Sequence, residues 1–307
     1  MSERFLVTGA LGCVGAWACR QLVREGVPVV SYDLGESRHR LELIMAPEEV
    51  AQVEFVRGDV TDLAALERVV DEHEITLILH LAALLIPLAR ADPVLGARVN
   101  VVGTVNVFEA VKRRHGRVRG LAYASSIGAY GAADGQRVRE DALGHPLTHY
   151  GVHKQANEGT ARVYWHDERV GSVGLRPWIV YGAGRDTGLT ADPTLAMVAA
   201  ARGDEYRIGF GGSCQYHYAP EVAGAFITAA REESEGAVVR NLGGPAVAIA
   251  DVVAAIEAAA PESAGRITYE ETPLPFPPEF EAGAPLTTPL ERGVRETIAL
   301  FKTGKVT

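Results

Sequence analysis

The first half of the chain alternates short apolar runs with amphipathic helical stretches. Strand-like runs occur at Arg4–Thr8, Val27–Asp33, Val53–Arg57, Ile75–His80 and Val118–Ala124. Helical spacing lies between them at Val14–Glu25, Leu63–His73 and Pro93–His115. Parallel strands need long crossover connections, and these are nearly always right-handed. The alternation therefore predicts an α/β fold with a doubly wound parallel sheet that helices cover on both faces.

The second half is less regular, although its pattern still predicts helices and strands. Helical spacing is found at Tyr150–Asp167, Pro193–Arg202, Pro220–Glu233, Ile249–Ala260 and Pro289–Lys302. Strand-like runs occur at Gly171–Tyr181 and Val238–Leu242. Thr272–Pro278 holds four prolines in seven residues, which predicts a loop or an extended segment.

Charge and composition exclude several classes of protein. The net charge of −9 disfavours a nucleic-acid binder, which needs a basic surface against phosphate. No apolar run approaches the roughly 18 residues of a membrane span, and the first residues lack the basic and apolar regions of a signal peptide. Cys13, Cys19 and Cys214 show no metal-ligand spacing, so we expect no metal site and a reducing, cytoplasmic location.

A glycine-rich motif follows the first strand-like run, where Gly9, Gly12 and Gly15 precede a helical pattern. In such a motif the first glycine permits a tight turn and the second lets the backbone approach a pyrophosphate. The third allows close packing of helix on strand, and the helix N-terminus then faces the phosphates. This placement favours nucleotide binding over a glycine turn that serves packing alone.

Asp33 ends the second strand-like run about 20 residues after the glycines. A carboxylate there can accept hydrogen bonds from the adenosine ribose, and it would repel a 2′-phosphate, which favours NAD over NADP. Arg38, His39 and Arg40 follow closely and offer the opposite interpretation, a phosphate site. We expect them instead to form a solvated loop or the start of a helix.

Tyr150 and Lys154 are four residues apart on a predicted helix, which places them on one face. A neighbouring ammonium favours the phenolate and lowers the pKa of the tyrosine, so that it can exchange a proton with a substrate hydroxyl. An exposed helix face also explains this pair taken alone, and we expect His153 at the surface. Ser125 and Ser126, at a strand end, either orient a substrate oxygen or begin a turn.

In their order and separation these motifs resemble the extended short-chain dehydrogenase/reductase family, in its NAD-dependent epimerase/dehydratase group. The family's TGxxGxxG, SSxxxYG and YxxxK patterns correspond to the glycines above, to Ser125–Gly131 and to Tyr150–Lys154. The resemblance is close from Arg4 to about Tyr181 and looser beyond. It implies a Rossmann-type fold, NAD as cofactor, and Ser126, Tyr150 and Lys154 as catalytic residues.

The resemblance also implies an organisation and further cofactor contacts. Residues 1–181 would form the NAD-binding domain, and residues 182–307 mainly a small substrate-binding lobe with segments that return to the core. Besides the three glycines, Asp33, Tyr150 and Lys154, the implied cofactor contacts are Asp59, Val60, Leu81, Ala82, Ala83 and Pro177.

Two departures from the family pattern narrow the expected chemistry. The acidic pair that the family's dehydratases carry after the catalytic hydroxyl is replaced by Ile127 and Gly128. Neither residue can act as an acid or a base, so dehydration is disfavoured. Cys214 or Gln215 stands where the nucleotide-sugar epimerases have a basic residue that binds the diphosphate. The substrate contacts we expect are Ser125, Ile127 and Arg185, and Arg185 either binds a carboxylate or phosphate or forms a salt bridge within its loop.

We therefore expect an NAD-dependent dehydrogenase that acts on a secondary alcohol of a small polar substrate. A sugar, a sugar acid and a hydroxy amino acid are the substrate classes considered. The alternative is an NAD-dependent sugar 4-epimerase, and a third hypothesis is a cofactor-sensing regulatory protein on the same fold.

A homodimer is a further expectation. The predicted helices Pro93–His115 and Tyr150–Asp167 resemble those that form a four-helix dimer interface in the family. Val101, Val105 and Phe108 suit such a face, and they equally suit packing on the sheet.

Overall fold

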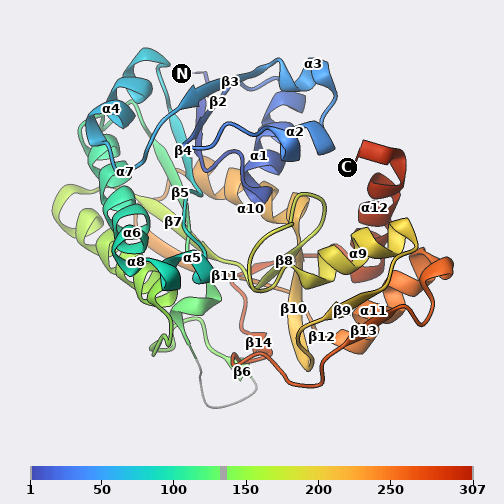
Figure 1. The fold of residues 1–307 in the computed structure, drawn as a ribbon. Coiled ribbons are helices and arrows are strands. Elements are labelled where there is room, and N and C mark those ends of the chain that lie inside the picture. The colour runs from blue at the N-terminus through green and yellow to red at the C-terminus, as the bar shows by residue number, and fades with distance from the viewer. Residues whose placement is uncertain (1, 132–136, 306–307) are drawn as a thin grey trace.

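The computed structural model describes residues 2–131 and 137–305, and within them the largest element is a sheet of eight parallel strands (Figure 1). The strand order is β15-β11-β7-β5-β4-β1-β2-β3. The strands are β1 (Phe5–Thr8), β2 (Val29–Asp33), β3 (Val53–Arg57), β4 (Leu77–His80), β5 (Gly120–Ala124), β7 (Ser172–Arg176), β11 (Ala237–Gly243) and β15 (Ala284–Pro285).

Successive residues of the central strands pack on opposite faces of this sheet. Phe5 and Val7 of β1 belong to the core beneath α1 (Cys13–Arg24) and α10 (Ala219–Arg231). Leu6 joins the opposite core, beneath α4 (Leu63–Glu72), α7 (Gly103–Lys112) and α8 (His149–Glu168). Such burial on both faces is typical of parallel sheets, and it confirms the predicted doubly wound α/β class.

The predicted helix Pro93–His115 is one helical rod that ends at Lys112. It consists of α6 (Pro93–Ala97), a π-helical turn at Arg98–Val102, and α7. Among the described residues it is the one helix with the length and apolar composition of a membrane span, and half of it is buried in the protein. Phe108 on this rod is buried and meets Tyr123 of β5 edge-on with ring centroids 5.9 Å apart, so it packs toward the sheet rather than outward.

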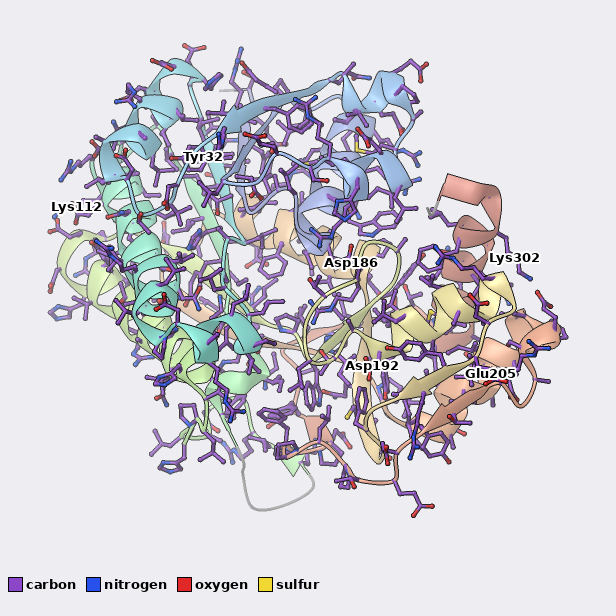
Figure 2. All side chains as sticks on the ribbon, viewed as in Figure 1. Tyr32, Lys112, Asp186, Asp192, Glu205 and Lys302 are labelled. Atoms are coloured by element: carbon purple, nitrogen blue, oxygen red, sulfur yellow. The ribbon has the colours of Figure 1, made fainter. Side chains whose placement is uncertain are left out.

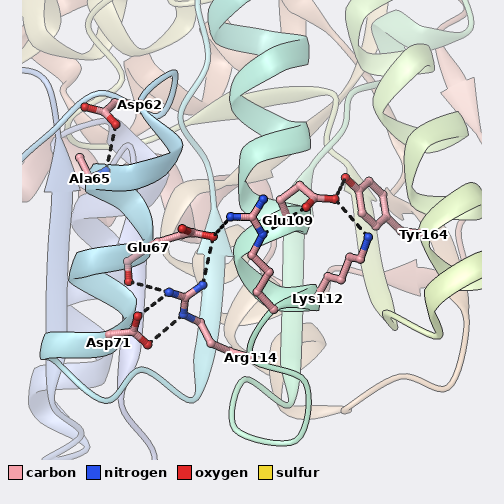
Figure 3. A network of polar contacts seen from close by, with 9 residues as sticks. Asp62, Ala65, Glu67, Asp71, Glu109, Lys112, Arg114 and Tyr164 are labelled. Atoms are coloured by element: carbon pink, nitrogen blue, oxygen red, sulfur yellow. Dashed lines mark hydrogen bonds and ion pairs between the residues drawn. The ribbon is translucent and has the colours of Figure 1, made fainter.

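Ion pairs and hydrogen bonds join the outer edges of α4, α7 and α8, and Figure 3 shows those around Arg114 and Glu109. Arg114, just after α7, donates to Asp71 of α4 and lies 3.3 Å from Glu67. On the other side of α7, Lys112 lies 2.8 Å from Glu168 of α8. These contacts fix the spacing of the three helices at the surface, while the core holds them on the sheet.

A second unit, which we call the lobe, consists of residues 179–218, 246–269 and 290–305. Its sheet contains β8 (Ile179–Tyr181), β10 (Ser213–Tyr218) and β12 (Ala246–Ala248), and its strand pair contains β9 (Tyr206–Ile208) and β13 (Ile267–Tyr269). Helices α9 (Asp192–Arg202), α11 (Ile249–Ala259) and α12 (Leu290–Leu300) complete it. Between these segments the chain returns to the large unit as α10 and β11.

Several short elements lie outside the sequence prediction, namely α3 (Pro47–Val50), α5 (Ile86–Ala91) and the pair β6 (Arg137–Val138) and β14 (Glu279–Phe280). The helix α2 (His39–Ile44) begins where the start of a helix was one of two expectations. The long helices agree closely, as for α8, which is predicted at Tyr150–Asp167 and observed at His149–Glu168.

Candidate active site

The glycine-rich turn brings the N-terminus of α1 against the ends of β1 and β4. A Cβ on Gly9, whose φ is +70°, would lie 2.6 Å from the backbone nitrogen of Ala82. A Cβ on Gly15 would lie 2.3 Å from the carbonyl oxygen of Gly9. Gly12 is the N-cap of α1, and the first turn has neither a side-chain cap nor an acidic residue. The backbone N–H groups of this first turn therefore remain free to bind an anion.

Asp33 lies at the end of β2 and supports this turn. Its Oδ2 accepts from the backbone N–H of Leu11 at 3.0 Å, and its Oδ1 accepts from that of Gly35 at 2.9 Å. Asp59 makes a local turn in which its carboxylate accepts from Thr61, and Val60 is buried. Both residues follow β3, which places them next to Asp33 at the same edge of the sheet.

Tyr150 and Ser126 meet where α8 begins and β5 ends. Ser126 caps a short 3-10 turn, and its Oγ accepts from the N–H of Gly128 at 3.0 Å. Both side chains line the same cavity. Burial raises the pKa of Tyr150, whereas the neighbouring Ser126 hydroxyl and the charge of Arg185 lower it.

Lys154 lies one helical turn beyond Tyr150 and is 3% exposed. Its Nζ donates to the carbonyl of Ala124 at 2.6 Å and lies 5.4 Å from the centre of the Tyr150 ring. Burial lowers the pKa of Lys154 to about 8, and the charge of Glu158 partly offsets this effect. The ammonium is thus held at the end of β5, on the same face of α8 as the phenol.

A buried ion pair supports this region from below. Arg176 of β7 donates from Nε and Nη2 to the two carboxylate oxygens of Glu158, at 2.7 and 2.6 Å. The Ser125 hydroxyl donates to the same carboxylate at 2.5 Å. Sequence reasoning did not identify Glu158, although its position four residues after Lys154 places it on the same helix face.

The glycine turn, Ser126, Tyr150 and Lys154 line one cavity of about 560 Å³. Of the predicted site residues, the lining includes Gly9, Gly12, Gly15, Leu81, Ala83, Ser125, Ser126, Ile127, Tyr150, Lys154, Pro177 and Arg185. Asp33, Asp59, Val60 and Ala82 stand outside that lining. Sequence reasoning missed its apolar wall, to which Leu85, Trp178, Leu189 and Phe276 contribute.

Residues 38–40 form the start of α2, one of the two expected alternatives, but Arg40 is not solvated as expected, because it lines the cavity. Its Nη1 donates to the carbonyl of Leu11 at 2.7 Å, and its Nη2 donates to Asp186 at 2.6 Å. It therefore links the glycine turn to the loop that follows β8. Its partner lies 146 residues away, and no local pattern indicates such a contact.

His153 is the second correction, since it is buried rather than at the surface. Only 7% of it is exposed, and its Nδ1 lies 3.3 Å from the amide nitrogen of Asn100 in the π-helical turn. The rod α6–α7 covers this face of α8, so a side chain that would otherwise meet solvent meets a helix.

Comparison with known proteins identifies the family. The sequence model of the NAD dependent epimerase/dehydratase family matches residues 5–243, which span the glycine turn, Ser126, Tyr150 and Lys154. The chain belongs to the NAD-dependent epimerase/dehydratase family. It is an enzyme of this family, and NAD is its cofactor.

The relatives and solved structures agree with this assignment. The chain is 32% identical to a UDP-glucose 4-epimerase of Mycolicibacterium smegmatis over 74% of its length and 72% of the relative. The match covers 63% of another curated relative that is 32% identical. Two solved structures share the fold, each with a TM-score of 0.84. A UDP-glucose 4-epimerase of Thermotoga maritima is 21% identical, and the match covers 98% of this chain and 99% of that one. An L-threonine dehydrogenase of Clostridium difficile is 20% identical, and the match covers 100% of this chain and 99% of that one.

The site residues fit the family's cofactor. The two clashes that a Cβ would make at Gly9 and Gly15 show a turn built for close approach, and the uncapped first turn of α1 opens into the cavity. A dinucleotide diphosphate is the kind of group that such a turn binds.

The depressed pKa of Lys154 leads to a prediction about stability. The unfolded chain has an ordinary lysine, so between about pH 8 and 10.5 it binds more protons than the folded protein does. The free energy of unfolding should therefore rise with pH in this window, by about 2 kcal/mol between pH 8 and 10. Urea denaturation without NAD, compared with Lys154→Met, isolates this contribution. Parallel pH curves for the two proteins would contradict the prediction.

Proposed function

We propose that this enzyme catalyses NAD-dependent hydride transfer at a secondary alcohol of a small polar substrate. The supporting observation is one cavity whose lining includes the glycine turn, Ser126, Tyr150 and the buried Lys154. On this proposal the catalytic residues are Ser126, Tyr150 and Lys154.

Each of the three residues has a distinct task in the proposed reaction. Bound NAD supplies the acceptor for the hydride that leaves the alcohol carbon. Tyr150, as phenolate, takes the hydroxyl proton while the carbon–oxygen bond becomes a carbonyl, and it returns the proton in the reverse direction. Ser126 donates a hydrogen bond to the same oxygen and orients it. Lys154 holds the nicotinamide ribose and adds positive charge near the phenolate.

We propose that the cofactor lies along the carboxyl ends of the strands, as is usual in open parallel sheets. Residues 1–181 would bind it, and residues 182–307 would supply mainly the substrate-binding lobe. The proposed cofactor contacts are Gly9, Gly12, Gly15, Asp33, Asp59, Val60, Leu81, Ala82, Ala83, Tyr150, Lys154 and Pro177. Ser125, Ile127 and Arg185 are proposed at the substrate end.

The lobe favours a substrate smaller than a nucleotide sugar. Cys214 and Gln215, at the position of the expected diphosphate-binding residue, are buried and do not line the cavity. The Gln215 amide donates to the carbonyls of Gly244 and Phe280 instead. A diphosphate at that position would therefore lack a charge-assisted contact from either residue.

A sugar 4-epimerase is the second candidate. It is supported by the match to a UDP-glucose 4-epimerase over 72% of that relative. Such an enzyme uses the same three residues, but it returns the hydride to the other face of the sugar and keeps its cofactor.

Tyr150→Phe tests the proposed acid/base residue. The variant keeps the ring and loses only the hydroxyl that exchanges the proton, so turnover should fall by roughly 10²–10⁴-fold or more. Binding of NAD, measured by calorimetry, should stay within a few-fold of the wild-type value. Full activity in the variant would exclude Tyr150 as the acid/base.

Absorbance at 340 nm distinguishes the two candidate reactions. A dehydrogenase should accumulate NADH in proportion to the alcohol consumed when it is incubated with added NAD and a panel of sugars, sugar acids and hydroxy amino acids. An epimerase should convert its sugar without net NADH. Denatured protein would then release the tightly held cofactor.

We further propose a cytoplasmic homodimer. Exposed valines gather on neighbouring helices, with Val94 and Val102 on the α6–α7 rod and Val152 and Val163 on α8, each between 47% and 71% exposed. In Figure 1 these helices lie side by side at the edge opposite the lobe. Such an apolar strip suits a second copy of the same chain. The free thiols of Cys13, Cys19 and Cys214 suit a reducing compartment.

Val102→Glu tests the dimer. A carboxylate in the proposed interface would be desolvated without a partner, so the dimer should weaken at least tenfold. The matched control is Tyr269→Glu, a similarly exposed position on β13 of the lobe, which should leave the mass unchanged. Light scattering at micromolar concentration gives the mass, and a wild-type monomer would refute the proposal.

A further inference from the structure

The cavity is lined by cations and by no carboxylate. Its charged lining residues among those that the structure describes are Arg40, Lys154 and Arg185, with no Asp or Glu. This is notable in a chain whose net charge is −9. A cation withdrawn from water needs a partner, so a lining of this kind is suited to a ligand that carries negative charge.

Two of the three cations already have partners within the protein. Arg40 binds Asp186 and the carbonyl of Leu11. Lys154 donates to the carbonyl of Ala124, and the charge of Glu158 stabilises its protonated form. These contacts account for the positions of both side chains without any ligand.

Arg185 differs from them, because its guanidinium has no anionic partner among the described residues. Within the described part of the chain, the guanidinium makes one hydrogen bond, from Nη2 to the Thr190 hydroxyl at 3.2 Å, and its Nε is buried without a partner. The adjacent carboxylate of Asp186, whose position Figure 2 labels, pairs instead with Arg40 at 2.6 Å and with His39 at 3.0 Å. The loop after β8 thus directs the carboxylate of Asp186 away from the guanidinium of Arg185, which remains in the cavity.

The loop is shaped to hold the guanidinium in that place. Gly184 and Gly188 have φ values of +88° and +104°, which few other residues adopt. A Cβ on Gly188 would lie only 3.1 Å from Nη2 of Arg185, so the glycine makes room for the side chain. Arg185 lines the same cavity as Ser126 and Tyr150, so its guanidinium and the proposed reacting groups share one ligand space.

We propose that Arg185 binds a carboxylate of the substrate, so that the enzyme acts on a hydroxy acid whose alcohol meets Tyr150. The fork of an arginine matches a carboxylate in a bidentate contact, and the unpartnered Nε is available for it. This inference rests on the proposed function. The same guanidinium chemistry also suits the diphosphate of the cofactor, so the test has an arm for each source of negative charge.

The experiment compares wild-type protein with Arg185→Gln, Arg185→Lys and the control Arg202→Gln, which removes an exposed arginine of α9 in the same lobe. Calorimetry first measures NAD binding to each protein. NAD-saturated protein is then titrated with D-glucuronate, D-galacturonate and L-threonine, and with the counterparts that lack the carboxylate, D-glucose, D-galactose and L-threoninol, at constant ionic strength.

The wild type should bind at least one acid roughly ten- to a hundred-fold more tightly than the counterpart that lacks the carboxylate. Arg185→Gln should abolish this preference with NAD affinity within twofold of wild type, Arg185→Lys should keep part of it, and Arg202→Gln should keep all of it. An equal loss of NAD and acid binding in Arg185→Gln assigns the guanidinium to the cofactor and overturns the proposal. So does the absence of any acid preference in the wild type. Loss of turnover in Tyr150→Phe is measured separately, so the proposed function stands or falls on its own.

Discussion

The buried ion pair between Glu158 and Arg176 is the interaction on which the geometry of the site depends. It joins α8, which carries Tyr150 and Lys154, to β7 and, through Ser125, to the end of β5. Removal of either partner would leave a charge in a site that water barely reaches, which is far more costly than the net contribution of the pair. The side chains above it are thus positioned by a contact that takes no direct part in the proposed chemistry.

Most of the fold could be predicted because its long elements carry their own periodicity. The parallel order of the large sheet follows from alternating strands and helices, and the bounds of α8 and α9 agree with the pattern to about one residue. Single turns of helix and strands of two residues, such as α3 or β14, contain too few positions for a period to emerge, so tertiary contacts define them. The π-helical turn at Arg98–Val102 inserts into a continuous apolar pattern that gives no sign of it.

The same distinction applies to the candidate site: short-range motifs could be recognised in the sequence, whereas residues from distant parts of the chain could not. The glycine turn and the Tyr150–Lys154 pair are short-range motifs, and the structure brings them to one cavity together with Ser126. Arg40 and Phe276 reach that cavity from distant parts of the chain, and their neighbours in sequence say nothing of it. His153 was misjudged because the face of α8 that it occupies is covered by another helix, whose position no single-sequence pattern reveals.

The return of the chain from the lobe to the large sheet has a consequence for how the protein is made. β7 at residues 172–176 pairs with β11 at residues 237–243, and α10 covers the sheet beside them. During synthesis the ribosome must therefore add more than sixty residues after β7 before its open edge is paired. Until then the growing chain exposes an unpaired strand beside an uncovered apolar face, the combination that chaperones bind and that aggregates most readily.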